Sequence, residues 1–509
     1  MSGEENSPAD EAERLEAAAL AALLSSGLIV GPDPHIVEEV RESPDLAPEP
    51  PNEYALESQV EEIYQEISQR APEHKIQPST ERVAACLEYL GNPQDSYRAI
   101  HITGTNGKTS TARMIEALLR EKGLRTGRFT SPHLTSVRER ICINGVAISA
   151  ADFIETWEEV KPIIEMVDAK SVQSGGSPLS FFEVFTVMAY AAFDTAAIDV
   201  AVVEVGMGGI WDATNVITAD IAVLMPVGLD HQKWLGATVA DIAREKLGIL
   251  KERKTLICAP QVPEVLQLVE ERVAAMHARL FYFGEDFRVL NRERGVGGQL
   301  ISVQTPAARY EDVPVAMFGA HQALNAAVAL KAVEEFFGGG ALDAQGVEQA
   351  LMATTSPGRL EVLKGSPAVI VDAAHNPAGM EVTLAALEEN FPGERIAVFS
   401  AMADKDIAGM LSLMEPSFSK IVVTQMPGPR GAELADLAAQ AEEVFGEDRV
   451  RAEADLGNAI SVAAELAAAS EVDAAREAKF LPPSIVILGS IMLVAQAREL
   501  LGARRPDSI

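Results

Sequence analysis

The residues with the clearest chemical potential lie in the segment 101–110, HITGTNGKTS, where a glycine loop precedes Lys108. Glycines allow the backbone to fold round an anion, and the N–H groups that open the following helix point toward it. Lys108 adds positive charge, and the Thr109 hydroxyl can reach a magnesium ion. Ile102 stands where the longer GxxxxGK[ST] loop has its first glycine, so this loop is a shorter variant. The segment predicts that a nucleotide is bound by Gly104, Thr105, Asn106, Gly107, Lys108, Thr109 and Ser110.

Three further polar residues follow apolar strand patterns. Glu204 lies at the C-terminal end of the apolar pattern AIDVAVVEVG, just before a run of glycines. His231 follows the next strand pattern, and Ser131 follows the strand-like GRFT. Ligands of open α/β sheets collect at the carboxyl ends of strands. A Glu at a strand end often caps a helix and a lone His is usually structural. Beside a phosphate loop, however, the three together favour a divalent metal site.

These groups need a scaffold that brings strand ends together, and the rest of the chain predicts one. Strand and helix patterns alternate twice, which favours mostly parallel sheets covered by helices on both faces. We predict an α/β fold, with a P-loop-type ATPase domain over residues 58–355 and a smaller doubly wound, Rossmann-like C-terminal domain over 356–509. Residues 281–317 are richer in short β patterns and predict a small antiparallel excursion. Expected strands lie at 97–103, 197–206, 219–228, 254–260, 368–374, 395–401, 420–426 and 484–490.

Composition narrows the functional classes. The 509 residues carry 42 Lys and Arg against 75 Asp and Glu, a net charge of −33 that repels phosphate backbones and anionic lipid, so we expect no nucleic-acid partner. Residues 1–57 hold fourteen acidic and two basic residues, and they predict an acidic, disordered leader. No stretch of the chain approaches ~20 uninterrupted apolar residues, so we expect no membrane span. The three cysteines, Cys86, Cys142 and Cys258, form no CxxC pair, which fits a reducing cytoplasm.

Ten motifs in order make the sequence resemble the ATP-dependent Mur ligase superfamily and, within it, the folylpolyglutamate synthase/dihydrofolate synthase family. The resemblance covers about residues 57–509. Its pieces are the GTNGKT loop with its flanks, FTSPHLTSVRERICING, SFFE, VVEVGMGGIWDATNV, GLDHQKWLG, REKLGILK, HQALN, SPGRLE, DAAHNP and MADKD. The resemblance implies an ATP-dependent ligase that adds L-glutamate to dihydropteroate, to folates, or to both.

The resemblance also assigns roles that the residues alone do not reveal. Lys246 lies in a helical pattern where a lysine is normally solvated, yet the matching lysine of the superfamily is carbamylated and holds a second Mg²⁺. The implied metal set is therefore Ser131, Glu204, His231 and carbamylated Lys246. Further nucleotide contacts implied by the resemblance are Asn325, Arg359 and Asp372, and His375 is expected to face the phosphates as a catalytic group beside Lys108 and Lys246. Within DAAHNP, Asn376 and Pro377 also suit a helix cap and first helical position, and both roles can hold together.

The pterin substrate is assigned by resemblance to three segments: the stretch before Glu81, the SFFE motif and the WDA segment. The aromatic residues there could stack on a flat ring, although aromatics at such spacing are more often core. Ile210 stands where other members often carry a polar or basic residue, which leaves the fine pterin preference open. The expected substrate-binding residues are Gln77, Pro78, Arg82, Ser180, Phe181, Phe182, Glu183, Trp211, Asp212 and Ala213.

Two other functional classes compete with this interpretation. A muramyl-peptide ligase shares the GTNGKT loop, but the chain offers neither an N-terminal uridine-binding domain nor that branch's version of DAAHNP. A regulatory protein that hydrolyses ATP without ligating would be favoured by loss of Glu204, His231 or Lys246, and all three are present. We expect a cytoplasmic monomer that uses ATP, two Mg²⁺ ions, L-glutamate and a pteroate or folate, with no membrane partner.

Overall fold

The structure, a computed structural model, describes residues 53–72, 78–426, 428, 430–476 and 481–503. The chain divides into a short first unit, Met1–Ala55, and one large unit, Leu56–Ile509. Most of the predicted acidic leader, and Gln77, therefore lie outside the described residues. No helix in the described part of the chain is long and apolar enough to cross a membrane.

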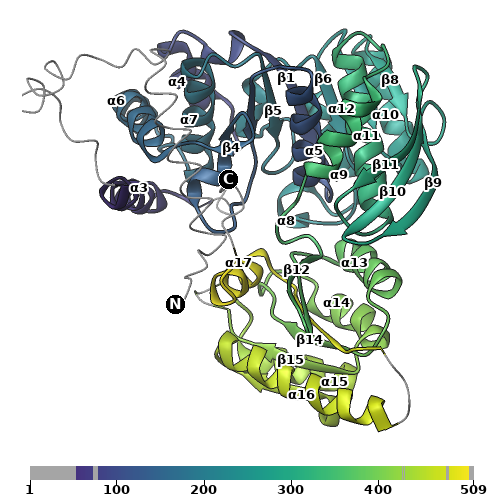
Figure 1. Ribbon diagram of the computed structural model, residues 1–509. Coiled ribbons are helices and arrows are strands. Elements are labelled where there is room, and N and C mark those ends of the chain that lie inside the picture. The colour runs from purple at the N-terminus through teal and green to yellow at the C-terminus, as the bar shows by residue number, and fades with distance from the viewer. Residues whose placement is uncertain (1–52, 73–77, 427, 429, 477–480, 504–509) are drawn as a thin grey trace, which may run out of the picture. The chain divides into compact units, whose positions relative to one another are not determined.

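An eight-stranded sheet forms the centre of the first half of the large unit (Figure 1). Its strand order is β4-β3-β2-β5-β1-β6-β7-β8, and all neighbours are parallel except the β2–β3 and β3–β4 pairs. The strands are β1 (Arg98–Thr103), β2 (Thr126–Phe129), β3 (Ile141–Ile143), β4 (Val146–Ala147), β5 (Val200–Glu204), β6 (Ile221–Leu224), β7 (Thr255–Cys258) and β8 (Arg279–Tyr282).

Helices cover both faces of this sheet because its strands are apolar on both sides. Val200 and Val202 of β5 point into one core, and Ala201 and Val203 point into the other, as the two-residue period of a strand requires. Figure 1 shows α5, α11 and α12 side by side on the first face. The helices of this half are α3 (Glu53–Ser68), α4 (Glu81–Tyr89), α5 (Lys108–Glu121), α6 (Ala150–Gln173), α7 (Phe181–Thr195), α8 (Gln232–Leu235), α9 (Val239–Lys246), α10 (Pro263–Ala275), α11 (Ala320–Phe336) and α12 (Ala344–Ala353).

A three-stranded antiparallel sheet stands between β8 and α11, as the sequence predicts for residues 281–317. Its strands are β9 (Arg288–Gly295), β10 (Gly298–Gln304) and β11 (Arg309–Val315), with β10 in the middle. Glu334 of α11 is fully buried and accepts hydrogen bonds from Thr305 Oγ1 at 2.7 Å and Tyr310 Oη at 2.9 Å. These bonds, with the shared apolar core, fasten the small sheet to α11.

The second half is a six-stranded sheet with order β12-β13-β17-β14-β15-β16, parallel except for the β12–β13 pair. One core packs it against α13, α14 and α15, and another against α16 and α17, so the sheet is doubly wound. The elements are β12 (Glu361–Gly365), β13 (Ala368–Asp372), α13 (Pro377–Asn390), β14 (Arg395–Phe399), α14 (Ile407–Met414), β15 (Lys420–Thr424), α15 (Leu434–Phe445), β16 (Val450–Glu453), α16 (Leu456–Arg476), β17 (Ser484–Leu488) and α17 (Ile491–Leu500).

The predicted α/β architecture is confirmed, with a mostly parallel sheet in each half. The register then positions the functional strand ends. Strand β1 lies between β5 and β6, with Ile102 opposite Glu204 and Thr103 opposite Leu224. The carboxyl ends of β1 and β5 therefore meet at one edge, and the loops that follow them are neighbours.

Candidate active site

The phosphate loop is a tight turn that only glycine can make at two positions. Gly104 has φ 146° and Gly107 has φ 87°, both in the region that L side chains avoid. A Cβ on Gly104 would lie 2.5 Å from the Cβ of Met225, and one on Gly107 would lie 2.9 Å from Asn325 Oδ1. Helix α5 begins directly after the loop, at Lys108, with Gly107 as its N-cap residue. The order strand, glycine loop and helix is present as predicted.

Thr109 joins the phosphate loop to the end of β5. Its hydroxyl donates to the Glu204 carboxylate, at 3.0 Å to Oε1 and 2.9 Å to Oε2. The Ser131 backbone also hydrogen-bonds Glu204, which brings the loop after β2 to the same point. Three of the predicted site residues are thus in direct contact. The sheet order, which sets β2, β5 and β1 side by side, explains why.

Lys108 is half-buried and lies near the buried Glu204. The Lys108 Nζ donates to Gly104 O at 3.1 Å and Thr105 O at 3.2 Å, so the ammonium lies across its own loop. Burial lowers the pKa of Lys108, and Glu204 and Asp230 oppose that shift. Burial raises the pKa of Glu204, and Lys108 and Thr109 oppose it. Each charge therefore favours the ionised form of the other.

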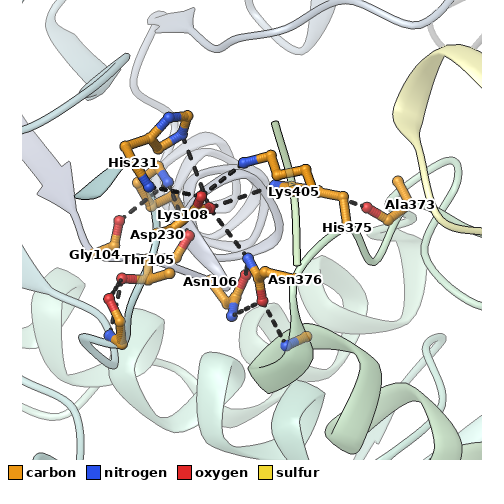
Figure 2. Close-up of polar contacts among 12 residues, drawn as sticks. Gly104, Thr105, Asn106, Lys108, Asp230, His231, Ala373, His375, Asn376 and Lys405 are labelled. Carbon is orange, nitrogen blue, oxygen red and sulfur yellow. Dashed lines mark hydrogen bonds and ion pairs between the residues drawn. The ribbon is translucent and has the colours of Figure 1, made fainter. Parts of the chain in front are cut away.

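The second half of the large unit brings its own polar groups to this loop (Figure 2). Lys405 Nζ lies 2.7 Å from Asp230 Oδ1, in an ion pair whose side chains are 11% and 10% exposed. Asn376 Nδ2 donates to Asp230 Oδ2 at 3.2 Å, and the Asn376 and Asn106 amides exchange two 3.3 Å hydrogen bonds. His375 Nε2 lies 3.7 Å from Asp230 Oδ2. Asp230 is thus surrounded by groups from both halves of the chain.

The charged and polar groups round Asp230 determine its pKa. Burial would raise its pKa, but His375, His231 and Lys405 outweigh burial and hold the pKa far below its usual range. His231 Nε2 lies 3.8 Å from Asp230 Oδ2, and the His231 side chain is 37% exposed. Partial desolvation lowers the pKa of His231 to about 4 despite that carboxylate. His231 is therefore a neutral imidazole at physiological pH, with a lone pair able to bind a metal ion.

Lys246 ends α9 and is buried, with 4% of its surface exposed. The glycine loop after β5 lies against it, since a Cβ on Gly209 would stand 2.9 Å from Lys246 Cα. Burial lowers the pKa of Lys246 to about 7, and Lys108 adds to the shift against Asp230 and Asp212. Lys246 is therefore not the solvated surface lysine that its helical pattern alone would suggest.

The predicted nucleotide residues differ in what they contact. Asn325 of α11 is 3% exposed and lies against Gly107 of the phosphate loop. Arg359 lines a small pocket together with Thr109 and Ser356. Asp372, by contrast, accepts hydrogen bonds at 2.9 Å from Leu360 N, Ala374 N and Thr383 Oγ1. Its carboxylate holds together the turn that leads to His375.

The predicted pterin segments have strong internal contacts. Ser180 and Glu183 form a capping box that begins α7, and Arg82 forms a 2.8 Å ion pair with Glu183. Phe181 is 8% exposed, and Phe182 packs on Phe129 with ring centroids 5.6 Å apart. The aromatic pair thus contributes to the core. Pro78, which lies just before α4, is exposed.

The WDA segment is likewise held by its own loop. The Asp212 carboxylate accepts hydrogen bonds at 2.9 Å from Met207 N and Thr214 N, and it caps the short 3₁₀ helix Ala213–Val216. Trp211 is half-buried and Ala213 is 6% exposed. These contacts fix the segment beside the glycines that follow Glu204.

Sequence reasoning assigned no role to Asp230 or Lys405 and saw Asn376 only as a helix cap. The signal was present, because Asp230 and Lys405 belong to the GLDHQKWLG and MADKD motifs. Motif membership does not say which side chains meet, however. Asp230 and Lys405 are 175 residues apart, so only the folded chain reveals the pair.

The metal prediction concerns a mixed donor set. In the described ranges, no group of three or more His, Cys, Asp or Glu side chains is arranged to hold a metal ion. The predicted set combines a carboxylate and a hydroxyl, the oxygen donors that Mg²⁺ prefers, with a neutral imidazole. Glu204 is 2% exposed, and its carboxylate accepts hydrogen bonds from Thr109 Oγ1 and the Ser131 backbone. A buried carboxylate next to a phosphate loop fits a divalent cation.

Comparison with known proteins supports the class that this geometry defines. The Mur ligase middle domain model matches residues 102–333, and the model of the Mur ligase glutamate ligase domain matches residues 358–474. Fold and site together define an ATP-dependent, amide-forming ligase of the Mur ligase type.

Relatives in sequence and structure identify the family within this class of ligases. The dihydrofolate synthase/folylpolyglutamate synthase of Mycobacterium tuberculosis is 44% identical over 467 residues, which cover 89% of this chain and 95% of the relative. The solved M. tuberculosis folylpolyglutamate synthase complexed with ADP has a TM-score of 0.84 at 42% identity, covering 89% of this chain and all of the other. A solved FPGS–AMPPCP–folate complex has a TM-score of 0.72 at 30% identity, covering 87% and 99%. This chain belongs to the dihydrofolate synthase/folylpolyglutamate synthase family.

Proposed function

We propose that this enzyme joins L-glutamate to dihydropteroate and extends the glutamate tail of folates, with cleavage of ATP to ADP and phosphate. The carrying observation is the Thr109–Glu204 contact, which closes a phosphate loop in a chain 44% identical to a dihydrofolate synthase/folylpolyglutamate synthase. The bifunctional form is favoured because that relative is named for both activities.

The reaction follows the chemistry of acyl phosphates. A carboxylate of the pterin acid attacks the γ-phosphorus of ATP, ADP leaves, and an acyl phosphate forms. The amine of glutamate then attacks the acyl carbon, loses a proton, and displaces phosphate to leave an amide. Lys108 balances the charge of the transferring phosphoryl group, with the loop N–H groups beside it. His375 is proposed to face the phosphates from the second half of the chain.

We propose that Ser131, Glu204 and His231 hold one Mg²⁺ and that a carbamate on Lys246 holds a second. Bound Mg²⁺ would neutralise phosphate oxygens and orient them for attack. The pKa of Lys246, lowered to about 7, supports the carbamate, because only a neutral amine reacts with carbon dioxide. The neutral imidazole of His231 supports its part as a ligand.

The remaining site residues are proposed by position. Asn325, Arg359 and Asp372 are assigned to the nucleotide, with Asp372 acting through the turn that it holds. The pterin is assigned by resemblance to the segment before Glu81, to SFFE and to WDA: Gln77, Pro78, Arg82, Ser180, Phe181, Phe182, Glu183, Trp211, Asp212 and Ala213.

We also propose a monomer that works in the cytoplasm. All three cysteines are free thiols, the state that a reducing compartment maintains. Light scattering on a sizing column tests the monomer.

The deciding experiment measures ADP release and product mass with three acids: dihydropteroate, tetrahydrofolate and a UDP-muramyl peptide. The proposal expects glutamate-dependent ADP release with the first two and products heavier by one glutamate residue for each step. If dihydropteroate is the only one of the three acids that gives a product, the enzyme is a dihydrofolate synthase and does not extend folate tails. Turnover of the muramyl peptide alone overturns the proposal in favour of the rival ligase, and ADP release without any acid favours a regulatory ATPase.

A further inference from the structure

The polar cluster round Asp230 brings side chains from both halves of the large unit together at the phosphate loop (Figure 2). Asp230 follows β6, Asn106 belongs to the phosphate loop, and Lys405 and Asn376 come from loops at the carboxyl ends of β14 and β13. The deeply buried Asn376, which is 3% exposed, bonds to Asp230 and to Asn106.

We propose that Asp230 is a positioning residue, which docks Lys405 and Asn376 on the phosphate loop and so sets the two halves of the active site in register. The proposal rests on the proposed function, and it concerns Asp230 and Lys405, to which neither the sequence nor the comparisons assign a role. Asp230 acts through its neighbours and is not itself a catalytic residue.

Each bond of the cluster limits the relative movement of the two halves. Lys405 and Asp230 form an ion pair of 2.7 Å that is about nine-tenths buried on both sides, so removal of one charge leaves the other without its partner in a poorly solvated place. Asn376 adds direction, because its Oδ1 is already used to cap α13, through Gly379 N at 2.7 Å. Its Nδ2 must therefore point away from the helix, toward Asp230 and the phosphate loop.

The chain offers a control in a second ion pair between the same two halves. Arg292 of β9 binds Glu389 of α13 through both guanidinium nitrogens, at 2.7 and 2.9 Å. That pair is more exposed, at 24% and 27%, and it lies on the small antiparallel sheet rather than at the phosphate loop. Like Asp230, the Arg292–Glu389 pair joins the two halves. Unlike Asp230, it does not lie at the phosphate loop.

The test is a double-mutant cycle of Asp230→Asn, Lys405→Met and the two combined, with Glu389→Gln as control. We expect each single variant to lose at least tenfold in kcat and to bind nucleotide as the wild type does, since the phosphate loop itself is intact. The double variant should be no worse than the poorer single variant within about twofold, because both changes break one interaction. Glu389→Gln should stay within about twofold of the wild type, and Lys405→Arg should recover part of the activity.

Three results would overturn the proposal. They are multiplicative losses in the double variant, a nucleotide affinity that falls in step with kcat, and a Glu389→Gln variant as impaired as Asp230→Asn. Thermal unfolding of the same variants reads the coupling without any substrate. The double variant should melt above the temperature that the summed single shifts give, and simple additivity would refute the pair. Wild-type enzyme that makes no product from the pterin acids refutes the proposed function instead and leaves this melting test valid.

Discussion

Lys246 carries the sharpest prediction, because its modification depends on a neutral amine. With a pKa of about 7, about three-quarters of the Lys246 amines are neutral at about pH 7.5, against about 0.1% for an ordinary lysine. Burial thus increases the reactive fraction several-hundredfold. We expect Lys246→Ala to lose most of the activity and to regain part of it when a small carboxylic acid supplies the missing anionic oxygens. Lys246→Arg should not recover, because guanidinium cannot carry a carbamate.

The same pKa predicts a dependence of stability on pH in buffer free of carbon dioxide. The folded-state pKa lies below the unfolded value near 10.5, so the unfolded chain binds more protons between about pH 7 and 10.5. Stability should therefore rise with pH through this window, and below it the buried ammonium costs up to about 5 kcal/mol. Lys246→Met, which keeps the volume without the charge, should be more stable than wild type near pH 6. The gap should close as the pH approaches 10.

The assay pairs glutamate-dependent ADP release with urea unfolding at several pH values, and ¹³C-bicarbonate NMR detects the carbamate directly. Lys233→Ala is the matched control, since Lys233 is an exposed lysine of the same region. The reasoning fails if Lys246→Ala and Lys246→Arg both turn over normally, or if the stability gap does not change with pH. If the enzyme is fully active but shows no carbamate signal, Lys246 is buried as described but is not carbamylated.

Three other substitutions test separate parts of the site. Lys108→Ala should abolish ADP release, whereas Lys122→Ala, at the exposed end of the same helix, should leave it intact; near-normal turnover of the first would remove the phosphate-loop assignment. Glu204→Gln keeps the shape but not the charge, so we expect about a hundredfold lower kcat and a higher Mg²⁺ requirement, and an unchanged Mg²⁺ titration would argue against Glu204 as a ligand. Glu183→Ala breaks the ion pair with Arg82 and the capping box, and should destabilise the protein by about 3 kcal/mol in thermal unfolding; a higher KM for the pterin acid at normal stability would instead indicate direct substrate contact.

The parts of the site that sequence reasoning predicts well are local. The phosphate loop runs from a strand into a helix, and each step has its own signal: an apolar run, glycines at positions with positive φ, and a helical pattern after Lys108. Glu204 was placed correctly at a strand end for the same reason. The contact between Glu204 and Thr109 then needs only that β1 and β5 be neighbours.

Helix α6 and strand β16, which the sequence patterns did not predict, each depart from a local sequence rule. Helix α6, Ala150–Gln173, was not predicted, and it contains Pro162, a residue that normally ends a helix because it lacks an N–H group. Its tertiary packing overrides that signal, since Phe153, Trp157 and Val160 are buried in the core. Strand β16, Val450–Glu453, is a short edge strand with an Arg and a Glu in only four residues, so no apolar run reveals it.

Asn376 shows why local and long-range information are both needed at one residue. The helix that begins at Pro377 calls for a cap, and Asp, Ser, Thr or Asn would each satisfy Gly379 N. The Asn376 amide accepts at the cap through Oδ1 and also donates through Nδ2, and this second contact is to the Asp230 carboxylate. An aspartate cap would instead place a second negative charge beside Asp230. Asn376 therefore serves the local cap and the distant carboxylate together, although the sequence pattern displays only the cap.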